Sequence, residues 1–194
     1  MKTRIVTIVT GIFLFGMSNM FGQGTMHGHH MTAGHNTEMK SYDVPDAFQK
    51  QLTGVLTDYL VLKDALVAAN ETEAEKAAKK TIKALDAVDT KLLEGEAYKT
   101  WKKQQKAIES NLNGIIQMKG MSMKRSHFSV VSENLTEAVK TFGIDHGQPV
   151  YVDYCPMANN NQGAYWLSME KEIKNPYSGD DAMMKCGTIK ATVN

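Results

Sequence analysis

The feature that most constrains the fold is an apolar residue at alternating steps of about three and four, repeated through four segments between residues 43 and 143. In the first segment, the apolar positions are Phe48, Leu52, Val55, Tyr59, Leu62 and Leu66. This spacing places the side chains on one face of a helix. The later segments carry Ala74, Ala78, Ile82, Leu85, Val88 and Leu92; then Tyr98, Trp101, Ile108, Leu112 and Ile115; then Phe128, Val131, Leu135, Ala138 and Phe142. Each segment therefore predicts an amphipathic helix.

The boundaries between these segments carry helix-capping and helix-stop residues. Asn70 precedes the second segment with Glu73 three residues later, a capping-box pattern, and Gly95 is its expected stop. Gly120 and Gly143 follow the third and fourth segments. Four helices of similar length with short connections favour an all-α fold, an antiparallel four-helix bundle.

After Gly143 the pattern changes to short runs of β-forming residues separated by turn residues. The runs are Val150–Tyr154, Ala164–Ser168 and Thr188–Val193. We expect a loop-rich C-terminal tail containing short β-strands and packed on the helices, with Tyr165, Trp166 and Tyr177 as buried anchors. The predicted folded domain is thus residues 43–194.

The N-terminus has the features of a signal peptide. Lys2 and Arg4 precede an apolar run, residues 5–15, that is shorter than the roughly 20 residues a membrane span needs. Gly22 and Gly24 offer a small-x-small cleavage pattern, which gives a signal peptide at residues 1–24. We therefore expect a periplasmic or otherwise extracytoplasmic protein with no stable membrane insertion after cleavage; an uncleaved anchor is the alternative.

Composition narrows the class of function. The 22 basic and 21 acidic side chains are balanced, so no nucleic-acid partner is expected, because phosphate binding needs concentrated positive charge. No Gly-x-Ser-x-Gly, phosphate-binding glycine loop or His-Glu-x-x-His pattern is present, and we expect no enzyme activity.

Residues 25–42 are rich in histidine and methionine and are expected to form a flexible segment. Its histidines predict accessory metal ligands, because imidazole suits Cu(II), zinc and nickel while methionine thioethers suit Cu(I). A polar linker is the alternative. These histidines are His27, His29, His30 and His35.

The densest sulfur pattern pairs Cys155-Pro-Met157 with Met183-Met-Lys-Cys186. Thiolates and thioethers prefer Cu(I) to harder cations, so Cys155, Met157, Met183 and Cys186 are predicted metal ligands. The alternative for the two cysteines is a disulfide, because extracytoplasmic compartments oxidise thiols. The residues alone leave both interpretations open.

A second group of donors surrounds the connection between the third and fourth helices. His127 is the predicted nitrogen ligand, although a lone helix histidine is more often a solvated or satisfied residue. Met118, Met121 and Met123 are predicted accessory thioether ligands, for which adaptable packing is the alternative.

Several motifs together resemble a known family. The stretches 151–158, 163–168, 173–177 and 183–187, with Tyr59–Leu66 in the first helix, are similar to the bacterial domain-of-unknown-function family 3347. Only Ser178 departs from the pattern, where the family usually has an aromatic residue. The family occurs alone or fused to periplasmic adaptor subunits of copper- and silver-efflux pumps. The resemblance implies a role in metal handling, with such an adaptor as a partner.

The sequence therefore predicts an extracytoplasmic metal-binding protein that buffers or delivers Cu(I) in connection with heavy-metal efflux. Silver and zinc are the other candidate metals. The alternative is a protein-interaction module of an envelope or efflux complex, with a structural Cys155–Cys186 disulfide and no metal. A thiol redox enzyme ranks last, because the chain has no Cys-x-x-Cys.

Overall fold

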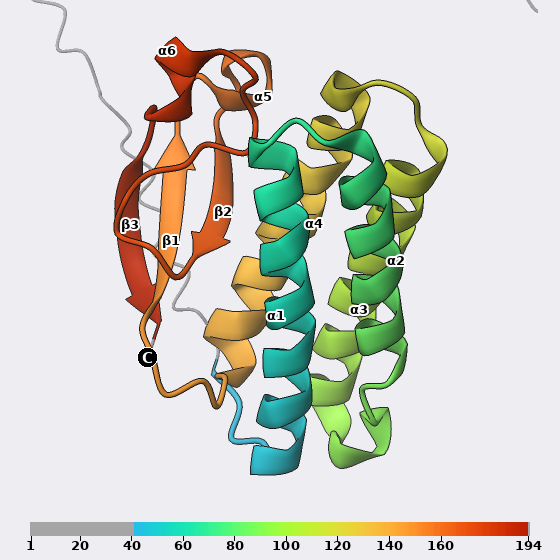
Figure 1. The fold of residues 1–194 in the computed structure, drawn as a ribbon. Helices are drawn as coiled ribbons and strands as arrows, with labels where there is room; N and C mark the ends of the chain where they lie inside the picture. The colour runs from blue at the N-terminus through green and yellow to red at the C-terminus, as the bar shows by residue number, and fades with distance from the viewer. Residues whose placement is uncertain (1–40, 194) are drawn as a thin grey trace, which may run out of the picture. The chain divides into compact units, whose positions relative to one another are not determined.

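The computed structural model describes residues 41–193, which are mostly helical and end in a small antiparallel sheet (Figure 1). The predicted signal peptide and the four histidines of the predicted His/Met segment lie outside the described residues. Among residues 41–193, no helix is both long enough and apolar enough to cross a membrane.

Four long helices account for most of the chain. They are α1 (Asp46–Val67), α2 (Glu71–Asp86), α3 (Gly95–Gln117) and α4 (Met121–Phe142). Each packs against the next along the chain. The predicted apolar stripe of α1 is fully buried, as is the stripe of α4 from Phe128 to Phe142. The core is therefore built from the periodic positions, and aromatic rings such as Phe48 and Trp101 contact one another inside it.

Two of the predicted helix boundaries are confirmed in detail. Asn70 caps α2 through its side-chain oxygen, which accepts the Glu73 backbone N–H at 3.1 Å. Gly143 follows α4 with φ +72°, a backbone conformation that favours glycine.

The second helix is shorter than its apolar pattern predicts. It ends at Asp86, and the chain continues through a short 3-10 helix, Thr90–Leu92. The Gln51 side chain accepts the Asp89 backbone N–H at 2.7 Å, so α1 fixes this connection. Val88 is still buried, because the loop returns it to the core, whereas Tyr98 in α3 is exposed.

The C-terminal segment forms a three-stranded sheet in the order β2-β1-β3, with β1 (Val150–Cys155) in the centre. β2 (Ala164–Ser168) and β3 (Thr188–Val193) both pair with it in antiparallel register, and β2 packs on α4. The three predicted strands are confirmed to within one residue. The sequence did not predict the short turns α5 (Ala158–Asn161) and α6 (Asp181–Met184).

The predicted aromatic anchors of this segment divide between the two faces of the sheet. Trp166 is fully buried, and its ring contacts that of Tyr177, which is partly buried. Tyr165 is 42% exposed, so the prediction that it is buried is wrong. The reason is strand alternation, which turns neighbouring side chains to opposite faces.

Candidate functional site

The predicted sulfur ligands of the C-terminal segment meet at a disulfide. Cys155 at the end of β1 is bonded to Cys186 just after α6, with 31 residues of sequence separation and Cα atoms 5.7 Å apart. Neither cysteine is a thiolate in this structure. The structure therefore has the disulfide that was the alternative interpretation, and the two predicted thiolate ligands are not present. The bond is consistent with an extracytoplasmic location.

The disulfide brings the two methionine-containing segments to one place. Met157 is 54% exposed directly before α5, whereas Met183 in α6 is half-buried against the core. Figure 1 shows α5 and α6 at the same end of the helices as the α1–α2 turn. Of these two predicted thioether ligands, Met157 is therefore the more accessible to a metal ion.

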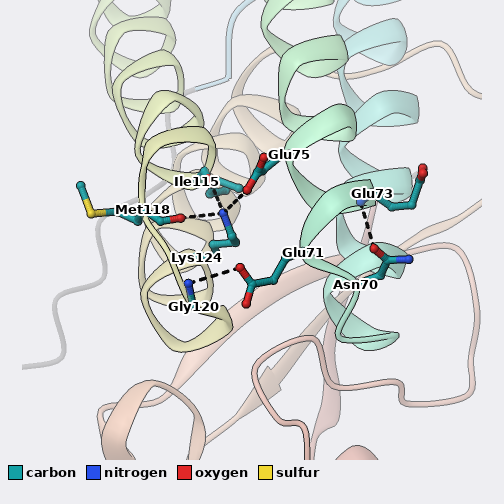
Figure 2. A network of polar contacts seen from close by, with 8 residues as sticks. All are labelled: Asn70, Glu71, Glu73, Glu75, Ile115, Met118, Gly120 and Lys124. Carbon is teal, nitrogen blue, oxygen red and sulfur yellow. Dashed lines mark hydrogen bonds and ion pairs between the residues drawn. The ribbon is translucent and has the colours of Figure 1, made fainter.

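The α3–α4 turn carries the other predicted thioethers. Met118 is 37% exposed and Met123 is 49% exposed, while Met121 is half-buried against the core. In Figure 2 the backbone oxygen of Met118 faces Lys124 and its thioether points away from the network. The sulfur of Met118 is thus accessible to a metal ion from solvent.

A network of polar contacts holds this turn in place (Figure 2). The buried Lys124 ammonium donates to Glu75 Oε1 at 2.8 Å and to the backbone oxygens of Ile115 at 2.8 Å and Met118 at 2.7 Å. Glu71 accepts the Gly120 backbone N–H at 3.2 Å. The hydrogen bond and positive charge of Lys124 lower the pKa of Glu75. Glu75 therefore pairs with a buried cation and links α2 to the α3–α4 turn.

His127, the predicted nitrogen ligand, contacts α3. Its Nδ1 lies 3.0 Å from Asn111 Oδ1, and its ring packs over Gly114, where a built Cβ would lie 2.6 Å from the ring. Both contacts place the imidazole between α3 and α4 and fix one ring nitrogen. These contacts give His127 a structural role, which agrees with the alternative of a satisfied helix histidine.

Arg125 joins three parts of the chain at this end of the molecule. Its Nη2 donates to the backbone oxygens of Leu66 at 3.0 Å and Ser178 at 2.8 Å, and its Nε donates to Pro176 O at 2.9 Å. Burial lowers its pKa. Arg125 thereby ties the last turn of α1 to the C-terminal segment, a role that no local sequence pattern indicates.

A small pocket of about 110 Å³ lies beside Arg125. It is lined by Ser122, Arg125, Ser126, Asn159, Asn160 and Tyr177. Met121 and Met123 flank Ser122 in the sequence, and Met157 lies two residues before Asn159. Residues close to these three methionines in the sequence therefore line the pocket, whereas the methionines themselves are not among its lining residues.

A buried polar seam lies where the sheet meets the helices. The Tyr59 hydroxyl lies 2.7 Å from Ser132 Oγ and accepts the Leu167 backbone N–H at 3.1 Å. Asp153 in β1 is fully buried, and neither carboxylate oxygen has a hydrogen-bond partner. Burial raises its pKa from 3.8 to about 6, an effect that the positive charge of Lys63 partly offsets.

Asp153 was missed by sequence reasoning, although a signal for it exists. It is an acidic residue inside the alternating run Val150–Tyr154, where the neighbouring positions are apolar or aromatic. An isolated carboxylate in a strand is expensive to bury, so this position was a candidate for a special role.

Within residues 41–193, no three histidine, cysteine, aspartate or glutamate side chains are grouped so that they could hold a metal ion. The thioethers of the exposed methionines are candidate soft ligands in this part of the chain, and the predicted imidazoles of residues 25–42 lie outside it.

Comparisons with known proteins give one match. No curated protein and no solved structure matches the chain. Residues 55–147 match the model of a family described as a protein of unknown function, DUF3347. The match runs from within α1 to the loop before β1, so the cysteine motifs lie beyond it. The match agrees with the resemblance to the DUF3347 family that the sequence motifs indicate, and it covers residues 55–147.

Proposed function

We propose that the protein captures Cu(I) outside the cytoplasm through methionine and histidine side chains, and buffers it or passes it to a heavy-metal efflux system. In this proposal Cys155 and Cys186 are a structural pair, and the predicted thiolate ligands are replaced by thioethers. The observation that carries it is the exposure of Met118, Met123 and Met157.

The exposed methionines present thioether sulfurs to the solvent. Seven large apolar side chains are exposed within the described residues, and three of them are these methionines. Methionine is normally among the buried residue types. Its neutral, polarisable sulfur binds Cu(I) and silver well but is a poor ligand for harder cations. Zinc would bind the histidines rather than the thioethers.

The folded part of the chain would serve as the support for these ligands. We infer that α1–α4 form an antiparallel four-helix bundle that acts as a rigid scaffold. We also infer that the protein works in the periplasm. The Lys124 network supports this role because it anchors the turn that carries Met118, Met121 and Met123. Histidines 27, 29, 30 and 35 would add imidazoles from residues 25–42.

A competition titration tests the proposal. The chain from residue 25 onward is titrated with Cu(I) against a chromogenic chelator, beside a variant that carries Met118→Leu, Met123→Leu and Met157→Leu. We expect the variant to lose Cu(I) affinity by about tenfold or more, because leucine keeps the volume and removes the sulfur. Met169→Leu, which removes a partly buried methionine after β2, is the matched control.

Deleting residues 25–42 separates the two ligand groups. If the shortened chain still binds Cu(I) and loses it in the triple variant, the thioethers of the folded part are ligands. Equal affinity in the wild type and the triple variant would contradict a thioether site.

A protein-interaction module is the second candidate, and the disulfide favours it because both cysteines are already used to fasten the sheet. Under this interpretation, neither the full chain nor the shortened one would hold Cu(I) against the chelator.

A further inference from the structure

A groove with lysines along it runs between α1 and α2. We call it the lysine groove, and its volume is about 570 Å³. Its lining residues are Val61, Glu73, Lys76, Ala77, Lys79, Lys80 and Lys83. Val61 is 49% exposed although it is apolar, and Ala77 is buried. The groove therefore combines small or apolar side chains with a row of amines.

The four lysines lie on one face of α2. Their spacing of three, one and three residues keeps all of them within about 100° of arc on a helix with 3.6 residues per turn. Each of the four is exposed. Their aliphatic stems can line the groove while the ammonium groups stay at its rim.

Positive charge in the groove exceeds what nearby carboxylates neutralise. Lys80 is paired with Asp58 at 2.8 Å, and Lys76 with Glu73 at 3.5 Å. Across the part of the chain that the structure describes, no ion pair involves Lys79 or Lys83. Lys79 and Lys83 therefore have no carboxylate at contact distance, although the charge of Lys79 still helps to lower the pKa of Glu75.

Gly54 lies on the same face of α1 as Val61, beyond the residues that line the groove. It lies two helical turns before Val61, it is exposed, and a Cβ built on it would meet nothing within 4 Å. Because the Asp58–Lys80 pair sets the antiparallel register, Gly54 lies level with the turn of α2 that carries Lys83. A glycine inside a helix costs about 1 kcal/mol relative to alanine, and no internal contact explains it here.

We propose that the lysine groove binds an acidic amphipathic helix of a partner protein. A helix matches the groove because its carboxylates can repeat at the same three- and four-residue steps as the lysines. Gly54 would allow its backbone to approach α1 closely. A bilayer surface fits less well, because it is flat and the groove is hollow. The proposal is independent of Cu(I) capture, which involves Met118, Met123 and Met157 instead.

The probe is a synthetic helical peptide of about 20 residues. It carries glutamates at four positions with the spacing of the lysines and alanines along the adjacent stripe. Its binding to the chain from residue 25 onward is measured by fluorescence anisotropy. Lys79→Glu with Lys83→Glu is expected to weaken binding by about tenfold or more, because it reverses the two unpaired charges. Lys103→Glu with Lys106→Glu, on exposed positions of α3, is the matched control and should change affinity less than about twofold.

Gly54→Ala provides a test that charge alone cannot reproduce. Alanine should raise the melting temperature of the free protein, because it favours the helix. It should also weaken peptide binding by about threefold or more, because a methyl group is added to the face of α1 that the peptide approaches. A peptide that does not bind, or that responds equally to the α2 and α3 charge reversals, would overturn the proposal. So would unchanged binding in Gly54→Ala, or tighter binding to vesicles of phosphatidylglycerol than to the peptide.

The Cu(I) titration run on the Lys79→Glu, Lys83→Glu variant keeps the two proposals apart. We expect its Cu(I) affinity to equal that of the wild type. Loss of peptide binding with Cu(I) binding intact supports the groove, whereas loss of both would indicate a damaged fold and contradict a specific groove.

Discussion

The helices α1–α4 and the C-terminal segment 150–193 are held together by different kinds of interaction. The helices bury continuous apolar stripes, and aromatic rings such as Phe48 and Trp101 meet edge to face between them. The C-terminal segment also buries Trp166 and Leu167 in this core, and single points fasten it in addition. These are the Cys155–Cys186 bond, the three hydrogen bonds of Arg125 and the hydroxyl of Tyr59.

This difference affects how each region should respond to change. When burial is spread over many apolar side chains, one substitution removes only a small part of the stabilising free energy. One substitution at a point attachment removes all of its contribution. The C-terminal segment also contains Asp153, a buried carboxyl without a hydrogen-bond partner, which costs stability when it ionises. We therefore expect the largest single-site effects, in both directions, in the C-terminal segment.

Removing the disulfide should have the largest effect. The double variant Cys155→Ala, Cys186→Ala frees a loop with 31 residues of sequence separation, and the chain-entropy model gives a loss of roughly 3–4 kcal/mol. Urea unfolding measures the loss. Hydrogen exchange should show protection falling in β1–β3 while the centres of α1–α4 keep theirs.

Wild type treated with a thiol reductant is the control for this variant and should unfold at the same urea concentration. Equal loss of protection in the helices and the sheet would contradict the distinction between the two regions, because it would mean that they unfold as one unit.

The helical region could be predicted from the sequence because its determinants are local. The spacing of Phe48, Leu52 and Val55 along one chain segment already defines the buried face of α1. Where local pattern and tertiary contact disagreed, the prediction failed. The apolar residues Val88 and Leu92 continue the stripe of α2, but the bond between Gln51 and Asp89 fixes a loop there.

The candidate site was predictable only in part, because it is assembled from distant residues. The two cysteine motifs were identified, and the structure joins them, yet the spacing of Cys155 and Cys186 could not distinguish a disulfide from two ligands. Arg125 bonds to the backbone oxygens of Leu66, Pro176 and Ser178, which carry no side-chain signature. Such contacts cannot be predicted from residue types.

A pH series should reveal the cost of the buried carboxyl. Burial raises the pKa of Asp153 from 3.8 to about 6, so the folded protein binds this proton more tightly than the unfolded chain. The resulting penalty is absent below about pH 4, grows between pH 4 and 6, and is complete above pH 6. Asp153→Asn should therefore stabilise the protein at pH 7 by roughly 2–3 kcal/mol and have little effect at pH 4.

Urea unfolding of both proteins at several pH values measures this difference. Asp145→Asn is the matched control, because Asp145 is half exposed and its side chain lies 3.8 Å from the exposed Lys50. No stabilisation by Asp153→Asn at pH 7 would indicate that Lys63 neutralises the carboxylate fully. The buried carboxyl would then carry no cost in stability at pH 7.

The smallest of these effects tests whether the helical region also has a point attachment. Lys124 is fully buried and holds Glu75 and the last carbonyls of α3. Lys124→Met keeps much of the side-chain volume but leaves those acceptors without their donor, and we expect a loss of about 2 kcal/mol. Lys76→Met removes an ion pair of the same type whose lysine is 76% exposed, so it should cost under about 0.5 kcal/mol. Equal losses in the two variants would mean that burial adds nothing to the Lys124 network. The loss from Lys124→Met could instead approach the loss from removing the disulfide. Single residues would then fasten both regions, and the helices would differ from the sheet only because their apolar pattern can be recognised in the sequence.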